Sequence, residues 1–263
     1  MALAPSWLRD LAGAWVFYSV LPPWPWPSAS FGRIARFAPF VGLVLGGLQV
    51  GVWWLLQGLG WSPAATIPVL IVCGLWSTGG LHSDGVMDTA DGLSAGRARC
   101  LEAMDDSRVG ASGVLAFAVV VLLKIAALAS LAERLPGVMP LVLCSAGFWG
   151  RCAPLWAMLR FPYLREQGTA GFHRAQAKGL REGWPALVIV AVTLTVSVPL
   201  GWAPLLSFTL LVGMISSVAV AEGLGRRLGG HTGDSYGASV VWTEVLTLGL
   251  LALMIPLLAR LAG

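Results

Sequence analysis

Residues 113–132 read GVLAFAVVVLLKIAALASLA, a run of twenty residues in which Lys124 is the single charge. A helix of about 20 mostly apolar residues is long enough to cross the hydrocarbon core of a bilayer. The run therefore predicts a membrane-spanning helix.

The rest of the chain has the same character. Of its 263 residues, 57% are hydrophobic and 11% are charged, whereas soluble domains carry about 25% charged residues. This composition excludes an ordinary soluble domain and a disordered, collagen-like or disulfide-stapled chain. Seven segments are long and apolar enough to span a membrane: residues 37–58, 64–81, 113–132, 138–159, 185–202, 204–223 and 239–259.

We therefore expect an all-α, polytopic membrane bundle of about seven transmembrane helices, forming one membrane-embedded domain over residues 1–263. The apolar stretch 11–21 is too short to span and predicts a short interfacial or re-entrant helix. Thirteen of the 17 Lys and Arg residues fall on one side of the predicted spans. By the positive-inside rule, the N-terminus and the loops 82–112, 160–184 and 224–238 are cytoplasmic, and the C-terminus is outside.

Acidic residues cluster in the first of these loops. Six of the 13 Asp and Glu residues lie there, namely Asp84, Asp88, Asp91, Glu102, Asp105 and Asp106. The first three stand at i, i+4 and i+7, so on a helix their carboxylates project from one face. Glycines at 92 and 96 predict two short helices joined by a loop, with the last three acids facing back toward the first three.

Carboxylates this close together repel one another unless a cation lies among them. Oxygen-only ligands favour Mg²⁺ or Mn²⁺, and Mg²⁺ usually keeps coordination positions for water and substrate phosphate. The cluster therefore predicts a metal site that holds phosphate. The alternative is a solvated acidic loop without a metal.

Two cations lie inside predicted spans, Lys124 in the third and Arg151 in the fourth. A charge at that depth needs a partner or a polar cavity. The two side chains predict an electropositive pocket for a phosphate or another anion; the alternatives are an ion pair with Glu244 or Glu222, or snorkelling to the interface. The glycine-rich loop 229–237 can bring backbone N–H groups to a phosphate, or can be a simple interfacial turn.

Three stretches, in order, resemble the motifs of one known family. Residues 79–93 read GGLHSDGVMDTADGL, residues 104–110 read MDDSRVG, and residues 229–237 read GGHTGDSYG. They resemble GGLHxDGxxDxxDG, MKDSRxG and GGxTGDxxG of the adenosylcobinamide-GDP ribazoletransferases, or cobalamin synthases, which are integral membrane enzymes of cobalamin biosynthesis. The likeness covers essentially the whole chain. In two departures, Asp105 replaces the usual lysine, and Phe17–Pro22 lacks the arginine of the family's FxTRLP motif.

The resemblance implies a reaction. A ribose hydroxyl of α-ribazole, or of its 5′-phosphate, attacks the cobinamide-side phosphorus of adenosylcobinamide-GDP. GMP leaves, and adenosylcobalamin or its 5′-phosphate forms. Attack on a diphosphate is helped by a metal ion that neutralises charge on the phosphate oxygens, which fits the acidic cluster.

The resemblance also implies roles for individual residues. Mg²⁺, or Mn²⁺ in its place, is the expected cofactor, and its expected ligands are Asp84, Asp88, Asp91 and Asp106. These four residues and His82 form the expected catalytic set, in which His82 or one of the carboxylates accepts the hydroxyl proton. The expected substrate-binding residues are Arg108, Lys124, Arg151, Arg165 and Asp234.

The same resemblance places the protein in the bacterial cytoplasmic (inner) membrane, with its active site on the cytoplasmic side. Its expected partners are adenosylcobinamide-GDP, α-ribazole or its 5′-phosphate, and the lipid bilayer, with no nucleic acid. A second copy of the chain, or neighbouring pathway enzymes docked on the basic loop 160–184, are further expected partners.

Two other functions fit parts of the sequence. Residues 88–95, DTADGLSA, match the opening DxxDGxxA of the CDP-alcohol phosphotransferases, but the continuation of that motif fails. A membrane transporter for a metal or a corrinoid is the alternative from another class. Transporters bind charge near the midplane and often have two related halves, whereas here the acids cluster at one surface and no second half repeats residues 84–106.

Overall fold

The computed structural model describes residues 4–165 and 179–261. Within those ranges the chain is built from helices, and a parallel bridge between Tyr163 and His231 is the only strand-like pairing. The α-helices are α1 (Ser6–Tyr18), α2 (Ala38–Gly58), α3 (Pro63–Ser77), α4 (Leu81–Ser94), α5 (Cys100–Asp105), α6 (Ala111–Arg134), α7 (Met139–Arg160), α9 (Trp184–Ser197), α10 (Ala203–Leu228) and α11 (Gly233–Leu261). The short 3₁₀ helices are η1 (Ile34–Phe37), η2 (Pro136–Val138) and η3 (Gly179–Glu182).

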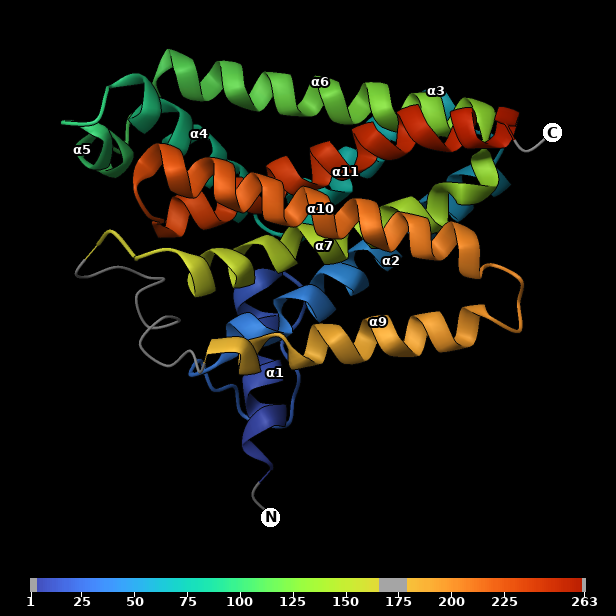
Figure 1. Ribbon diagram of the computed structural model, residues 1–263, viewed down its shortest axis with the longest axis horizontal. Helices are drawn as coiled ribbons and strands as arrows, with labels where there is room; N and C mark the ends of the chain where they lie inside the picture. Colours follow the sequence, from blue (N-terminus) through green and yellow to red (C-terminus); the bar gives the residue numbers. More distant parts are fainter. Residues whose placement is uncertain (1–3, 166–178, 262–263) are drawn as a thin grey trace.

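The predicted all-α membrane bundle is confirmed. Five helices are long and apolar enough to cross a membrane, namely η1 with α2, α6, η2 with α7, α10, and α11 up to Ile255. They correspond to five of the seven predicted spans, and Figure 1 shows them running along the long dimension of the molecule.

The other two predicted spans are shorter than expected. The stretch predicted at 64–81 forms α3, which ends at Ser77 and turns by 89° into α4. Gly79 and Gly80 make this turn with φ values of 60° and 76°, which residues with a side chain rarely adopt. The stretch predicted at 185–202 forms α9, whose 14 residues end at Ser197. The bent pair of α3 and α4 counts as a sixth span only if it is one broken span.

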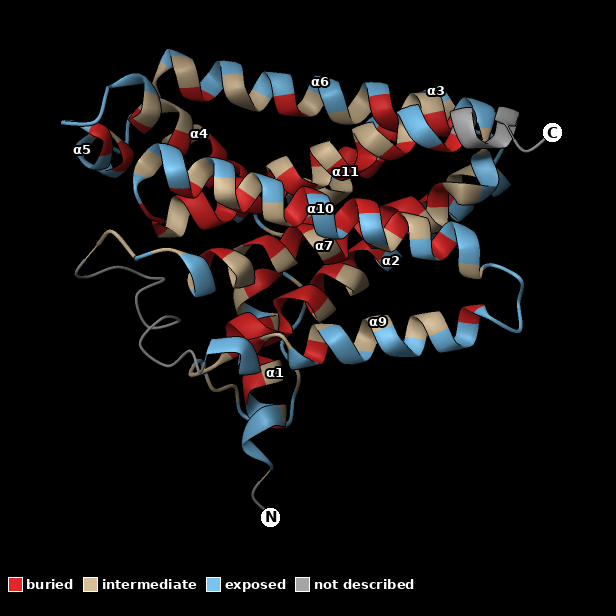
Figure 2. Cartoon of the chain, in the orientation of Figure 1, coloured by how far each residue is buried: buried red, intermediate tan, exposed pale blue. Residues whose placement is uncertain are grey.

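Helix α7 lies at the centre of the bundle and packs against α2, α10 and α11. A Cβ on Gly42 of α2 would lie 2.1 Å from the carbonyl oxygen of Gly147 in α7, so the two backbones nearly touch. Small residues allow membrane helices to approach this closely. Figure 2 shows buried residues concentrated on α2, α7 and α11, whereas α9 and the outward face of α6 are exposed, as expected for surfaces that contact lipid.

Helix α1 covers most of the apolar stretch predicted at 11–21. It runs across the direction of the long helices in Figure 1, which fits a helix lying along the membrane surface. A buried ion pair holds it there, because Nη2 of Arg36 in η1 lies 2.6 Å from Oδ2 of Asp10. Tyr18, at the end of α1, stacks on His82 of α4 with the ring centroids 6.4 Å apart.

The predicted loops are shorter than expected, because helices extend into them. The acidic segment 82–112 consists mainly of α4 and α5, which confirms the two short helices predicted there. The loop predicted at 224–238 shrinks to residues 229–232, since α10 ends at Leu228 and α11 begins at Gly233. In the loop 160–184, residues 166–178 lie outside the described residues, and so does the docking surface expected on them.

Candidate active site

The three motif segments meet at one end of the bundle, on the left of Figure 1, where α4, α5 and the turn between α10 and α11 lie. Glycines permit this approach. A Cβ on Gly85 of α4 would lie 2.4 Å from the backbone oxygen of Asp234, and a Cβ on Gly237 of α11 would lie 3.3 Å from Cα of His82. The close contact of α4 with α11 therefore joins the first and the third motif.

Asp84 and Asp88 are the free carboxylates of this site. The negative charges of Asp84, Asp234 and Asp91 all repel the charge of Asp88, which shows that the four carboxylates share one region. Among the described residues, neither Asp84 nor Asp88 has a hydrogen-bond or ion-pair partner. The prediction that α4 presents several carboxylates on one face is confirmed, and among the described residues Asp84 and Asp88 have no direct partner for their charges.

Asp91 makes contacts of a different kind. Its Oδ2 accepts a hydrogen bond of 2.7 Å from the backbone N–H of Gly110, and its Oδ1 accepts one of 2.8 Å from the N–H of Gly113. These N–H groups lie at the start of α6, where a helix leaves its first donors without intrahelical partners. Asp91 therefore caps α6 from α4, and the glycines leave room for it, since a Cβ on Gly110 would lie 2.4 Å from Asp91 Oδ1.

Asp106, the fourth predicted metal ligand, is not brought to the other three. Its carboxylate accepts hydrogen bonds from the Arg108 side chain at 3.0 and 2.7 Å and from the Arg108 backbone N–H at 3.0 Å. These bonds from Arg108 lower the pKa of Asp106 to about 2. Glu102 likewise pairs at the surface with Arg99, at 3.3 Å. Glu102 and Asp106 are therefore each taken up by a neighbouring arginine, and no contact of either with a carboxylate of α4 supports the expectation that they face back toward that helix.

Asp105 faces the site in place of Asp106. Nη2 of Arg165 lies 2.8 Å from Oδ1 of Asp105 and 2.9 Å from Oδ2 of Asp234. Arg165 is held there by its own segment, since the N–H of Leu164 donates to the carbonyl of His231 at 2.8 Å. One guanidinium therefore links α5, α11 and the segment that follows α7, and it brings together Arg165 and Asp234, two of the residues expected to bind substrate.

The glycine-rich loop is fixed by a buried histidine. His231 is fully buried; its Nε2 lies 3.1 Å from the Ala221 carbonyl oxygen, so this nitrogen donates, and its Nδ1 lies 3.0 Å from Ser235 Oγ. Burial lowers the pKa of His231 to about 4. The neutral imidazole therefore holds the turn between α10 and α11 in a single shape and places Asp234 at the first turn of α11.

A pocket of about 200 Å³ lies beside these carboxylates. Its walls include the side chains of Asp84, Asp234, Arg151, His82 and Tyr18. An open groove of about 1110 Å³, lined largely by apolar side chains from α1, α3, α4 and α6, adjoins it, and Asp84 lies in the walls of both. The pocket presents carboxylates and a guanidinium to one small volume.

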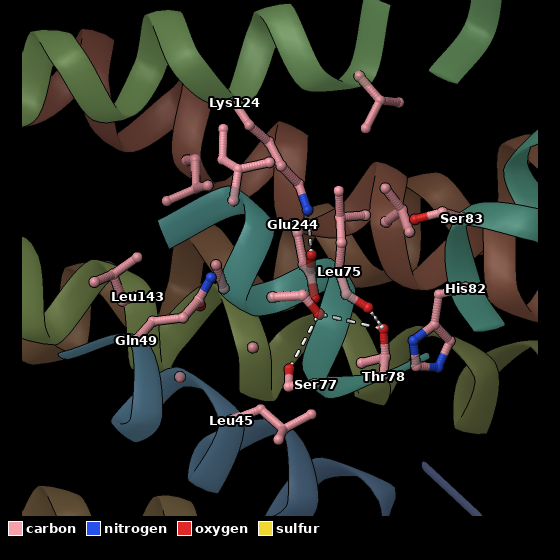
Figure 3. Close-up of a pocket in the computed structure, with 18 of the residues that line it drawn as sticks. Leu45, Gln49, Leu75, Ser77, Thr78, His82, Ser83, Lys124, Leu143 and Glu244 are labelled. Atoms are coloured by element: carbon pink, nitrogen blue, oxygen red, sulfur yellow. Dashed lines mark hydrogen bonds and ion pairs between the residues drawn. The ribbon is translucent and has the colours of Figure 1, made fainter. Parts of the chain in front are cut away.

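The two cations predicted inside spans share one carboxylate. Lys124 Nζ of α6 lies 2.5 Å from Oε2 of Glu244, and Arg151 Nη1 of α7 lies 2.7 Å from its Oε1. Figure 3 shows Lys124 pointing to Glu244 across a small cavity whose wall also includes His82. Of the two partners considered from the sequence, Glu244 of α11 is the one used, whereas Glu222 pairs with Arg160 and Arg226.

No three His, Cys, Asp or Glu side chains in the described part of the chain already have the geometry of a metal site. A preformed cage is not required for Mg²⁺, which is commonly held by one or two carboxylates together with water and substrate phosphates. The unpaired and mutually repelling carboxylates of Asp84 and Asp88 fit that kind of site.

Residues 10–252 match the model of a protein family described as Cobalamin-5-phosphate synthase. The chain belongs to this family. A protein named adenosylcobinamide-GDP ribazoletransferase from Prochlorococcus marinus (strain MIT 9313) is 58% identical over 260 residues, covering 96% of this chain and 98% of that protein. A protein of the same name from Thermosynechococcus vestitus is 43% identical, covering 91% of this chain and 94% of that protein. No solved structure matches the chain.

Membership of the cobalamin-5-phosphate synthase family confirms the resemblance predicted from the three motifs, and the chain is therefore an enzyme. Sequence reasoning gave no role to two residues that the structure places near the pocket. Asp105 is adjacent to Asp106, and nothing in the sequence tells which of the two faces the site. Glu244 was considered only as a structural partner, although a carboxylate inside a predicted span is itself a signal of function.

Proposed function

We propose that this enzyme joins adenosylcobinamide-GDP to α-ribazole, or to its 5′-phosphate, with release of GMP. The proposal rests on one observation, the 58% identity over 96% of the chain to a protein whose name states this transfer. The site is compatible with it, because the free carboxylate of Asp84, the carboxylate of Asp234 and the buried guanidinium of Arg151 line one pocket. Such a pocket suits a diphosphate, which needs positioning and charge neutralisation more than covalent help.

The proposed cofactor is Mg²⁺, with Mn²⁺ as a substitute, held by Asp84 and Asp88. Their charges repel each other and have no partner among the described residues, so binding a divalent cation would relieve the repulsion. When bound, the ion would neutralise charge on the diphosphate oxygens. Asp91 and Asp106 already accept hydrogen bonds from the start of α6 and from Arg108, and we assign them to positioning these segments.

The chain's own residues then have distinct roles. The proton of the attacking ribose hydroxyl would pass to His82 or to one of the pocket carboxylates, since both kinds of group line the pocket. The hydroxyl oxygen forms a bond to the cobinamide-side phosphorus while the bond from that phosphorus to the GMP oxygen breaks. Arg151 lines the pocket and Arg165 binds Asp234 of its wall, so these two arginines would meet the phosphate groups. Arg108, which pairs with Asp106 at the surface, has no contact that supports the expected role in substrate binding.

The two cavities suit the two ends of a large substrate. The smaller pocket has carboxylates and a guanidinium in its walls, which suits the diphosphate. The open groove beside it is lined by apolar side chains such as Phe17, Trp76 and Phe117. We propose that the corrinoid lies along this groove, with its phosphate at Asp84. Substrate pockets commonly combine apolar walls with a few polar groups that fix orientation.

We further propose that the protein lies in the bacterial inner membrane with this pocket facing the cytoplasm. The carboxylates, Arg165 and the turn between α10 and α11 lie at one end of the long helices (Figure 1), and the loops at this end carry most of the Lys and Arg residues. By the positive-inside rule that end is cytoplasmic.

The test compares purified wild type with Asp88→Asn, supplied with adenosylcobinamide-GDP and α-ribazole phosphate, with and without Mg²⁺. We expect wild type to release GMP and form the coupled corrinoid only with the metal, and folded Asp88→Asn to do neither. Glu102→Gln is the matched control, because it removes an exposed carboxylate of the same segment that pairs only with Arg99. A folded wild type that couples nothing with any divalent metal would overturn the proposal.

A further inference from the structure

A second, smaller cavity lies deeper in the bundle, beside the substrate pocket. It has a volume of about 70 Å³ and is enclosed by α2, α3, α4, α6, α7 and α11. Polar side chains from several of these helices line it, namely Gln49, Thr78, His82, Lys124, Arg151 and Glu244. So many polar groups inside a membrane bundle are costly and mark function more often than packing.

The charges around this cavity do not balance. Glu244 is the only acidic residue among the described residues that line it, and both Lys124 and Arg151 bind it, at 2.5 and 2.7 Å. Two positive charges therefore share one negative charge. A structural ion pair needs only one partner of each sign, and burying an additional charge adds a desolvation penalty. The lining of this cavity therefore carries one surplus positive charge. The nearest other carboxylates, Asp84 and Asp234, line the adjoining substrate pocket, where a bound cation would neutralise them and leave the surplus for an anionic substrate.

Arg151 is the member of this group that reaches the substrate pocket. Its side chain is 5% exposed and lies in the walls of both cavities. Its Nη1 donates hydrogen bonds to Glu244 at 2.7 Å and to the Gly147 carbonyl at 3.0 Å. Its Nε is buried and has no hydrogen-bond partner. The inner contacts fix the guanidinium and leave donor capacity for something else.

The surrounding glycines hold this arrangement in place. A Cβ on Gly42 of α2 would lie 2.4 Å from Cδ of Arg151, and a Cβ on Gly150 of α7 would lie 2.9 Å from Cγ of Glu244. The backbones of α2 and α7 therefore close around the two side chains and leave few alternative positions for them.

We propose that Lys124, Glu244 and Arg151 form a net-positive triad, in which Glu244 positions Arg151 at the substrate pocket and Lys124 supplies the surplus charge that draws in a diphosphate. Lys124 then acts through Glu244 and does not touch the substrate. The inference rests on the proposed function for the identity of the anion. A purely structural role predicts no selective change in the KM for the anionic substrate when Lys124 is neutralised, whereas the triad predicts one.

The first test replaces Lys124 by Met, which leaves a neutral pair of Arg151 and Glu244. We expect the KM for the anionic adenosylcobinamide-GDP to rise about tenfold, as for the loss of one charge roughly 10 Å away in a partly shielded interior. The KM for the neutral acceptor α-ribazole should stay at the wild-type value, and Lys124→Arg should restore both. Unchanged KM values in Lys124→Met, or an equal rise in both, would overturn the proposal.

The second test separates charge from position. The double variant Lys124→Met/Glu244→Gln keeps one net positive charge on Arg151 but removes the carboxylate that holds it. We expect its KM for adenosylcobinamide-GDP to return toward the wild-type value while kcat stays at least tenfold lower. A double variant with wild-type kcat would show that Glu244 does not position Arg151.

A third readout does not depend on turnover. GDP carries the diphosphate but has no cobinamide to transfer, so its dissociation constant with Mg²⁺ present reports on the triad even if the protein couples nothing. We expect Lys124→Met to bind GDP about tenfold more weakly than wild type and Lys124→Arg to bind it equally well. Equal GDP binding by wild type and Lys124→Met would refute the triad, whereas absent coupling with intact GDP discrimination would refute only the proposed reaction.

Discussion

The substitution Asp91→Asn separates a helix cap from a metal ligand. Both oxygens of Asp91 accept backbone hydrogen bonds, at 2.7 and 2.8 Å, from the start of α6. Asparagine keeps one acceptor oxygen and turns an NH₂ group toward the other N–H, so one bond is lost and one donor is left unsatisfied. The two effects together cost about 2–3 kcal/mol of unfolding free energy, which corresponds to a drop in Tm of about 5–10 °C for a chain of this size.

The assay is thermal unfolding of the purified protein, followed by activity at increasing Mg²⁺ concentration. We expect Asp91→Asn to lower Tm while the Mg²⁺ concentration for half-maximal rate stays at the wild-type value. Asp88→Asn is the matched control on the same helix: because its carboxylate is repelled by its neighbours and has no described partner, its loss should not lower Tm. If Asp91→Asn keeps the wild-type Tm and needs more Mg²⁺, Asp91 is a metal ligand and the capping role is wrong.

Three further predictions follow from the site. Gly85→Ala places a methyl group 2.4 Å from the Asp234 backbone oxygen and should slow coupling more than tenfold in initial-rate assays, whereas Gly47→Ala, with nothing within 4 Å, should match wild type. Arg165→Gln should raise the KM for adenosylcobinamide-GDP and also lower Tm, because it removes the partly buried ion pair with Asp234 as well as the exposed one with Asp105. An unchanged KM would argue against a contact with substrate. Burial lowers the pKa of His231 from 6.5 to about 4, so as pH falls this histidine is protonated in the unfolded chain before it is protonated in the folded one. The free energy of unfolding should therefore be constant above pH 7 and fall by about 3 kcal/mol between pH 6.5 and 4, with a parallel decline in Tm. If His231→Gln leaves this pH dependence unchanged, His231 is not its cause.

The sequence predicts helices well here because one physical signal dominates. An apolar run such as residues 113–132 must form a helix in a bilayer to satisfy its backbone, so its structure depends little on neighbouring segments. The bend between α3 and α4 is less visible, since it depends on left-handed φ values at Gly79 and Gly80, and glycine permits that conformation without requiring it.

The site is harder to predict because the spacing of residues along a helix shows which face a side chain lies on, but not which groups it contacts. The i, i+4, i+7 pattern correctly places Asp84, Asp88 and Asp91 on α4. It does not show that the carboxylate of Asp91 accepts hydrogen bonds from the backbone at the start of α6. The same holds for Asp105 and Asp106: a turn after α5 decides that the first meets Arg165 and the second meets Arg108. These partners come from helices that pack only in the folded bundle.

The sharing of Glu244 by Lys124 and Arg151 has a consequence for how the protein is made. The cations lie in α6 and α7, whereas the carboxylate that neutralises them lies in α11, which leaves the ribosome after both of them. A basic residue near the centre of a helix opposes insertion by about 2.5–3.5 kcal/mol, so α6 and α7 must enter the bilayer on the strength of their apolar residues alone. A nascent chain that has not yet reached α11 thus holds two unpaired charges in lipid, and the arrival of Glu244 with α11 is the step that neutralises them.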